Sequence, residues 1–198
     1  MPLVKTQAEG INLADTFAFT GTVSGVGGDL LYSLTSSSSV TAHDISSTYI
    51  NSTYDNYQLI GYFEGDGDTK YLYCQVFVGG VVQTGSIYGN SASALDGADY
   101  ENNNTTSSLI IATTTGMGGA DGEGTSVNML FQNANSTRAP FRTSGIATKF
   151  DGDANHGGSV FDGSLKPANR ANVVNGLRFK MHSGDITYAE FRLYGIKN

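Results

Sequence analysis

The sequence has no tryptophan and only one cysteine and three prolines among its 198 residues. A single cysteine excludes an intrachain disulfide, so the fold cannot depend on one. Charged residues make up 15% of the chain, against about 25% in an average soluble domain. Because the exposed faces of helices are rich in charged residues, alanine and leucine, this low charge disfavours a helical protein.

Long apolar runs are also missing, since no stretch approaches the length of about 18 residues that a membrane-spanning helix needs. The N-terminal residues MPLVKTQAEG contain no apolar segment typical of a signal peptide. We therefore expect a soluble protein made in a cytosol, with no membrane insertion. The formal net charge of −7 disfavours nucleic acid as a partner, because an acidic protein gains nothing from releasing phosphate counterions.

The charge is unevenly distributed along the chain. Residues 1–137 contain two basic residues against 13 acidic ones, whereas residues 138–198 contain nine basic against five acidic ones. If strands from both parts interleave in one fold, these charges mix on its surface. Alternatively, the molecule is bipolar and stacks head to tail with copies of itself.

Glycine, aromatic and hydroxyl residues are abundant. Glycine numbers 26, and tyrosine and phenylalanine together number 21, which is enough aromatic mass for a core. Apolar and polar residues alternate over many short segments, as in strands with one buried face. Eight to ten such strands at close spacing predict an all-β fold, an antiparallel β-sandwich.

Two hairpins are expected from this alternation. The first joins strands at 57–64 and 70–78, and the second joins strands on either side of the turn at 183–185. In the second hairpin, one face of the sequence is apolar and should be buried, namely Leu177, Phe179, Met181, Ala189, Phe191 and Leu193.

The remaining strands are expected at 81–88, 108–113, 126–132 and 141–150, and the segment 30–40 is expected to be a strand pair or a strand and a turn. In the strand at 126–132, Val127, Met129 and Phe131 should point inward. The polar stretch 89–107 is predicted to be a long loop, and 114–124 a glycine-rich loop. Cys74 lies in an alternating apolar run, so we expect it to be a buried small hydrophobe.

The first 28 residues differ from the rest. Small or polar residues alternate there with an apolar set, Ile11, Leu13, Phe17, Phe19 and Val23, and a glycine-rich joint follows at 24–28. The strip is either the first strand of the same domain or a segment that docks on a partner chain. We expect the second arrangement, an extended N-terminal docking arm at 1–28 followed by a sandwich domain at 29–198.

Three segments resemble a family of bacteriophage virion proteins found in phages of marine and freshwater bacteria, cyanophages included. They are GINLADTFAFTGTVSG at 10–25, SSTYINSTYDNYQLI at 46–60, and NGLRFKMHSGDITYAEFRLYGIKN at 175–198. The resemblance implies a jelly-roll-like sandwich on the virion surface. It also implies that the strip at 11–25 is an attachment segment.

From this resemblance we expect a non-enzymatic structural protein, a subunit of a tail fibre or another appendage. It would assemble into virions in the bacterial cytoplasm, with other tail or capsid proteins as partners and as a homotrimer. The alternatives are a capsid decoration or cement protein, and a module that binds a receptor or glycan on the host surface.

No catalytic residue, cofactor or resident metal is expected. The histidines His43, His156 and His182 belong to no recognisable catalytic motif and are expected at the surface. The turn at 64–69 resembles a fragment of a calcium loop through Asp66 and Asp68, but lacks the final glutamate that an EF-hand requires. An ordinary turn and a calcium site both remain open there.

Six tyrosines crowd one region of the sequence, namely Tyr49, Tyr54, Tyr57, Tyr62, Tyr71 and Tyr73. Such rings either fill a core or subunit interface, or stack on sugars when they are exposed.

Overall fold

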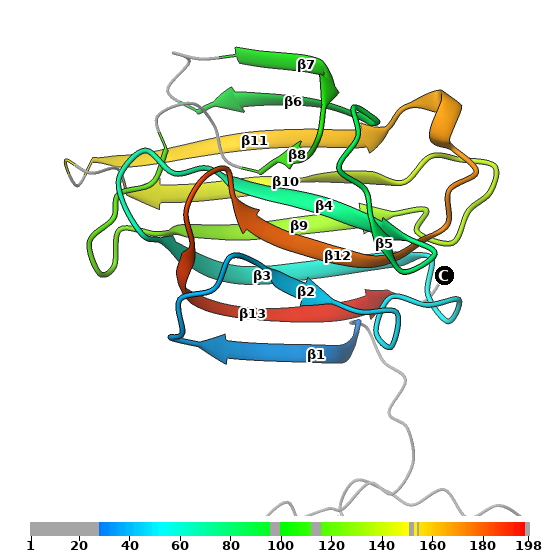
Figure 1. Ribbon diagram of the computed structural model, residues 1–198, viewed down its shortest axis with the longest axis horizontal. Helices are drawn as coiled ribbons and strands as arrows, with labels where there is room; N and C mark the ends of the chain where they lie inside the picture. The colour runs from blue at the N-terminus through cyan, green and yellow to red at the C-terminus, as the bar shows by residue number, and fades with distance from the viewer. Residues whose placement is uncertain (1–27, 96–99, 112–115, 151–152, 154, 197–198) are drawn as a thin grey trace, which may run out of the picture.

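The computed structural model describes residues 28–95, 100–111, 116–150, 153 and 155–196. Figure 1 shows two layers of strands packed face to face, with all pairings antiparallel. The predicted all-β antiparallel sandwich is therefore confirmed. Within the described residues, no helix is both long and apolar enough to cross a membrane.

The larger layer is an eight-stranded sheet. In spatial order its strands are β1 (Asp29–Ser36), β13 (Ile186–Ile196), β3 (Asn56–Gly65), β9 (Thr125–Gln132), β10 (Arg142–Phe150), β11 (His156–Leu165), β6 (Tyr88–Ala94) and β7 (Tyr100–Thr106).

The smaller layer is a five-stranded sheet. Its spatial order is β2 (His43–Ile45), β12 (Val174–Met181), β4 (Leu72–Val78) and β5 (Val81–Val82), and β8 (Leu109–Ile110) also pairs with β4. A short 3-10 helix, η2 (Pro167–Asn169), connects β11 to β12.

The strands β1 and β2 pair with the two C-terminal strands of the fold. β1 pairs with β13 in the large sheet, and β2 pairs with β12 in the small sheet. Successive strands from β1 to β4 alternate between the two layers, as in the winding of a jelly roll. Four further strands, β10, β11, β6 and β7, extend the large sheet beyond β9.

Both predicted hairpins are wrong. The strands at 57–64 and 70–78 are present as β3 and β4, but they belong to different sheets, and so do β12 and β13. The turn at 183–185 therefore carries the chain from one layer to the other. Period-two alternation shows which side of a strand is buried, and that side is the same in a hairpin and in an arch between packed sheets.

The expected long loop at 89–107 is also wrong, because most of it forms the antiparallel pair β6 and β7. Its asparagine and serine residues have low β-propensity, yet Tyr88, Asn90 and Ala92 alternate into the interior. The predicted strand at 81–88 is divided between β5 and the start of β6. The ten-residue strand β11 was not anticipated.

Phenylalanine rings from both layers form the centre of the core. Phe63 lies 5.4 Å from both Phe179 and Phe191, measured between ring centroids. The inward positions predicted for the two C-terminal strands and for the strand at 126–132 are all buried. Cys74 is a free, fully buried cysteine, as expected.

Two buried tyrosines tie strands to loops through their hydroxyl groups. The Tyr88 hydroxyl, from the large sheet, accepts the Val76 N–H of the small sheet at 3.0 Å and donates to the Gln83 carbonyl at 2.8 Å. The Tyr57 hydroxyl donates to the Asn51 carbonyl at 2.8 Å. Burial raises the pKa of both phenols. These bonds satisfy backbone groups that the sheets leave unpaired.

Candidate functional site

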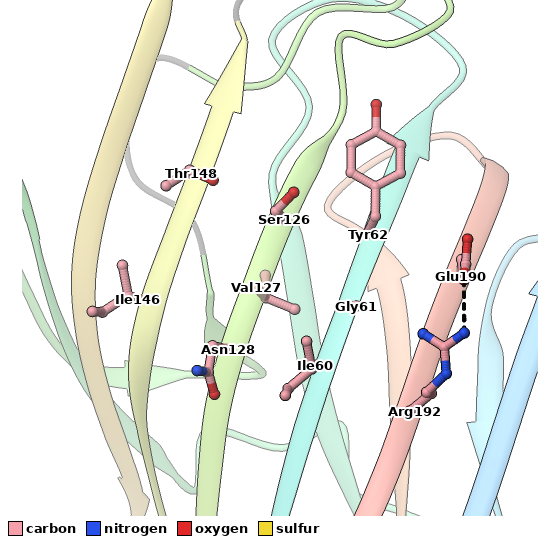
Figure 2. Close-up of a pocket in the computed structure, with 10 residues that line it drawn as sticks. All are labelled: Ile60, Gly61, Tyr62, Ser126, Val127, Asn128, Ile146, Thr148, Glu190 and Arg192. Carbon is pink, nitrogen blue, oxygen red and sulfur yellow. Dashed lines mark hydrogen bonds and ion pairs between the residues drawn. The ribbon is translucent and has the colours of Figure 1, made fainter. Parts of the chain in front are cut away.

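The outer face of the large sheet carries a shallow depression of about 480 Å³, which we call the β9 groove (Figure 2). Ten residues from four adjacent strands line it, namely Ile60, Gly61, Tyr62, Ser126, Val127, Asn128, Ile146, Thr148, Glu190 and Arg192.

The groove results from side-chain length on neighbouring strands. Ser126 and Asn128 point outward from β9, and Figure 2 shows them between the side chains of β3 and β10. In register, Asn128 pairs with Ile60 on one side and with Ile146 on the other. Asn128 therefore lies between two aliphatic side chains, whereas Ser126 lies between Tyr62 and Thr148.

These two aliphatic side chains belong to a row that crosses the sheet. Ile146 pairs with Val160 of β11, so Ile60, Ile146 and Val160 lie at equivalent register positions. Their side chains are 46%, 52% and 42% exposed. Asn128 of β9 lies between Ile60 and Ile146 in this register, and Ile146 and Val160 are direct neighbours. Single exposed aliphatic residues are common, but three at one register position of a sheet mark a surface that another molecule can cover. We call these three residues the aliphatic row.

Paired charges lie on β13, at one end of the row. The Arg192 guanidinium contacts the Glu190 carboxylate at 3.2 Å, and the Tyr188 hydroxyl lies 3.3 Å from the same carboxylate. Figure 2 shows this ion pair beside Ile60 and Tyr62. The carboxylate is thus neutralised by its neighbour and presents no isolated acid to the groove.

The other polar groups of the groove are held by hydrogen bonds. The Tyr62 hydroxyl donates to Glu64 Oε1 at 2.8 Å and accepts the Gly124 N–H at 2.9 Å. Burial, followed by the hydrogen bond to Glu64, raises the pKa of Tyr62 to about 12. Asn128 accepts a hydrogen bond from Gln58 at 2.9 Å. The groove therefore combines fixed hydrogen-bonding groups with aliphatic contact area.

The three histidines have separate surroundings. His156 and His182 are exposed as expected, next to Phe150 and Tyr71 respectively. His43 departs from the expectation, because its Nε2 atom is buried without a hydrogen-bond partner and its ring faces Phe191. Burial lowers the pKa of His43, and the nearby Asp44 carboxylate opposes that shift.

The turn with Asp66 and Asp68 uses its carboxylates within the protein. Asp66 forms an ion pair with Lys70 at 3.3 Å, and Asp68 accepts the Gly119 N–H at 2.9 Å. In the part of the chain that the structure describes, no three acidic, histidine or cysteine side chains are grouped as metal ligands.

The docking-arm residues Ile11, Leu13, Phe17, Phe19 and Val23 lie outside the described residues. The six crowded tyrosines are divided between different environments. Tyr57 is in the core, Tyr54 packs against Tyr57, Tyr62 lines the β9 groove, and Tyr49 packs on Tyr32. Tyr73 points outward from β4, and Tyr71, just before β4, packs against His182.

Sequence reasoning missed the aliphatic row. The sequence signal for the row is an apolar residue at an outward position of β3, β10 and β11. Ile146, for example, lies between the buried residues Thr143 and Ala147. The chain matches no protein-family model, no curated protein and no solved structure. The likeness to phage virion proteins rests on the sequence motifs alone and stays a prediction.

Proposed function

We propose that this chain is a non-enzymatic structural subunit of a bacteriophage virion, in a tail fibre or another surface appendage. It docks on a neighbouring virion protein through the arm that contains Ile11, Leu13, Phe17, Phe19 and Val23, and it displays the sandwich outward. The sequence resemblance supports this role. The jelly-roll winding agrees with the fold that the resemblance implies.

The observation that carries the proposal is the aliphatic row on the large sheet. A subunit packed among identical copies buries such a surface against its neighbours, whereas an isolated domain leaves it in water. We infer that a second copy of this chain covers the row. Around a threefold axis, the row of each copy would pack against the same row of the others.

The charges beside the aliphatic row favour a second copy of this chain as the molecule that covers it. Glu190 and Arg192 lie side by side at the end of the row, with 40% and 51% of their side chains exposed. Around a threefold axis, the Arg192 of each copy can lie opposite the Glu190 of the next, so one patch supplies both charges of the contact.

The self-association is tested by mass measurement at micromolar concentration. We expect the full chain to be a trimer and the Ile146→Lys variant to be a monomer, because a buried lysine would lack a partner in the interface. Val81→Lys is the matched control, since Val81 is an exposed aliphatic residue on the small sheet. A monomeric full chain, or equal effects of both lysines, would contradict the inferred contact.

The attachment role is tested by deleting residues 1–25 and following incorporation into particles. The truncated chain should keep the circular dichroism and melting transition of a folded sandwich, but it should be missing from purified virions. Incorporation of the truncated chain at the level of the full chain would refute docking through the arm. Loss of folding on truncation would instead assign the strip to the core.

A further inference from the structure

The small sheet, on the opposite side of the sandwich from the β9 groove, has its own pocket. This pocket has a volume of about 250 Å³ and is lined by Tyr73, Ser86, Thr106, Ser107, Ser108 and Ile110. Tyr73 pairs with Ile110 of β8, which brings the hydroxyl-rich segment 106–108 next to its ring. Ser86 and Ser107 are exposed at this pocket, which we call the Tyr73 pocket.

Aromatic rings lie beside the pocket. The His182 ring lies 4.9 Å from Tyr71 and 6.2 Å from Tyr73, measured between centroids. The buried residues Leu72 and Cys74 flank Tyr73 along β4, so the Tyr73 side chain points away from the core. A ring face is electron-rich, and the C–H groups on one face of a pyranose carry partial positive charge, so sugars stack on such rings.

Positive charge accumulates around the same rings. Lys180 pairs in register with Tyr73 across β12 and β4, and Lys70 reaches the Ser183 hydroxyl, which in turn contacts His182 at 3.1 Å. Burial lowers the pKa of His182, and the charges of Lys70 and Lys180 lower it further. Both lysines therefore lie near the His182 ring.

Two nearby carboxylates form ion pairs with other cations, and a third accepts a hydrogen bond from a serine. Asp66 pairs with Lys70 at 3.3 Å, Asp44 holds Arg178 through two contacts of 2.7 Å, and Asp185 accepts a hydrogen bond from Ser39. Among the described residues, no carboxylate forms an ion pair with Lys180. Lys180 is therefore the cation available to an external anion beside the Tyr73 ring.

We propose that this surface binds a carboxylated sugar residue of an acidic polysaccharide. The pyranose ring stacks on Tyr73, its carboxylate pairs with Lys180, and its hydroxyl groups bond with the serine hydroxyls of the Tyr73 pocket. Binding sites for small ligands usually combine aromatic side chains with a few polar groups that fix the orientation of the ligand. The site lies on the sheet that the proposed contact between copies leaves uncovered, and it does not depend on that contact.

The probe is an oligomer of galacturonic acid, added to the full-length protein and followed by calorimetry and by the NMR signals of the histidine rings. We expect saturable binding at millimolar concentration or below. The pKa of His182 should rise in the complex, because a nearby carboxylate favours the charged imidazolium. The chemical shifts of His156, on the large sheet, should not change.

Variants and a matched ligand locate the site. Lys180→Gln and Tyr73→Leu should each weaken binding about tenfold or more, since one removes the cation and the other replaces the ring with an aliphatic group. Lys166→Gln, which removes a positive charge at the end of β11, should bind like the unchanged protein. The fully methyl-esterified oligomer should bind at least tenfold more weakly than the acid.

Three results would overturn the proposal. They are no binding of the acidic oligomer at millimolar concentration, equal binding of the esterified oligomer, and binding unaffected by both Lys180→Gln and Tyr73→Leu. Each of these results can be distinguished from a failure of the proposed virion function. That function is tested by mass measurement and particle incorporation, which do not depend on the Tyr73 pocket.

Discussion

Phe179 of the small sheet and Phe191 of the large sheet face each other across the sandwich, with their ring centroids 5.9 Å apart. Both side chains are fully buried. The two residues come from β12 and β13, which are consecutive in sequence but belong to different layers. Their contact therefore joins the two sheets directly, and its loss should weaken the association of the layers.

Replacing Phe191 with alanine should lower the free energy of unfolding by about 3–5 kcal/mol, the range for removing a buried aromatic ring. Denaturant titration followed by circular dichroism measures this change. Arg192→Ala is the control at the next position. In the Ile146→Lys background, which should be monomeric, we expect a change within about 0.5 kcal/mol because the Arg192 side chain points into solvent there. Equal losses in the two variants would contradict the assigned inward and outward faces.

Replacing Gly61 with alanine should destabilise the fold by about 1–3 kcal/mol, as overpacking a core does. A Cβ atom at Gly61 would lie 2.4 Å from the Phe191 Cβ and 2.9 Å from the Glu190 carbonyl oxygen. Gly67→Ala is the matched control, because its Cβ would meet only the end of Lys70 at 3.5 Å. If thermal melting showed both variants to be as stable as the unchanged protein, the close approach of β3 to β13 would be wrong.

Cys74 should be unreactive in the folded protein. Complete burial raises the pKa of its thiol, which removes the thiolate that reacts with disulfide reagents. Reaction with a chromogenic disulfide at pH 8 should release no product from the native chain and one equivalent in guanidinium. Rapid labelling of a chain that retains its native circular dichroism would place Cys74 at an accessible position.

Stability should fall in alkali through Tyr62, whose pKa is raised from 10 to about 12. A pKa raised by folding means that the folded state holds the proton more tightly, so this contribution is complete below pH 10. It is lost as the pH rises from 10 toward 12. Melting curves between pH 7 and 11.5 should show that Tyr62→Phe loses less stability in alkali than the unchanged protein. An equal loss of stability in the two proteins would show that Tyr62 is not its source.

The inward faces of most strands could be predicted from the sequence because alternation follows from the pleat of a strand. Val127, Met129 and Phe131 were assigned correctly on that basis. The partner of each strand could not be predicted, since β4 shows the same alternation whether it pairs with β3 or packs against it. The pairing is set by contacts between distant residues, such as Leu177 with Val76.

The aliphatic row and the Tyr73 pocket were hidden for a related reason. Ile60, Ile146 and Val160 lie far apart in the sequence, and only the register of β3, β9, β10 and β11 aligns them. Likewise, Lys180 and Tyr73 come from strands more than a hundred residues apart. A sequence pattern detects features along one strand, whereas both surfaces are built across strands.

The pairing of β1 with β13 has a consequence for synthesis on the ribosome. β13 lies between β1 and β3, so neither of these early strands gains that neighbour until residues 186–196 have emerged. The most distant contacts in sequence are thus needed to complete the large sheet, and such contacts form slowly. A nascent chain exposes unpaired strand edges until its last residues are made, which makes premature termination near the C-terminus a cause of aggregation.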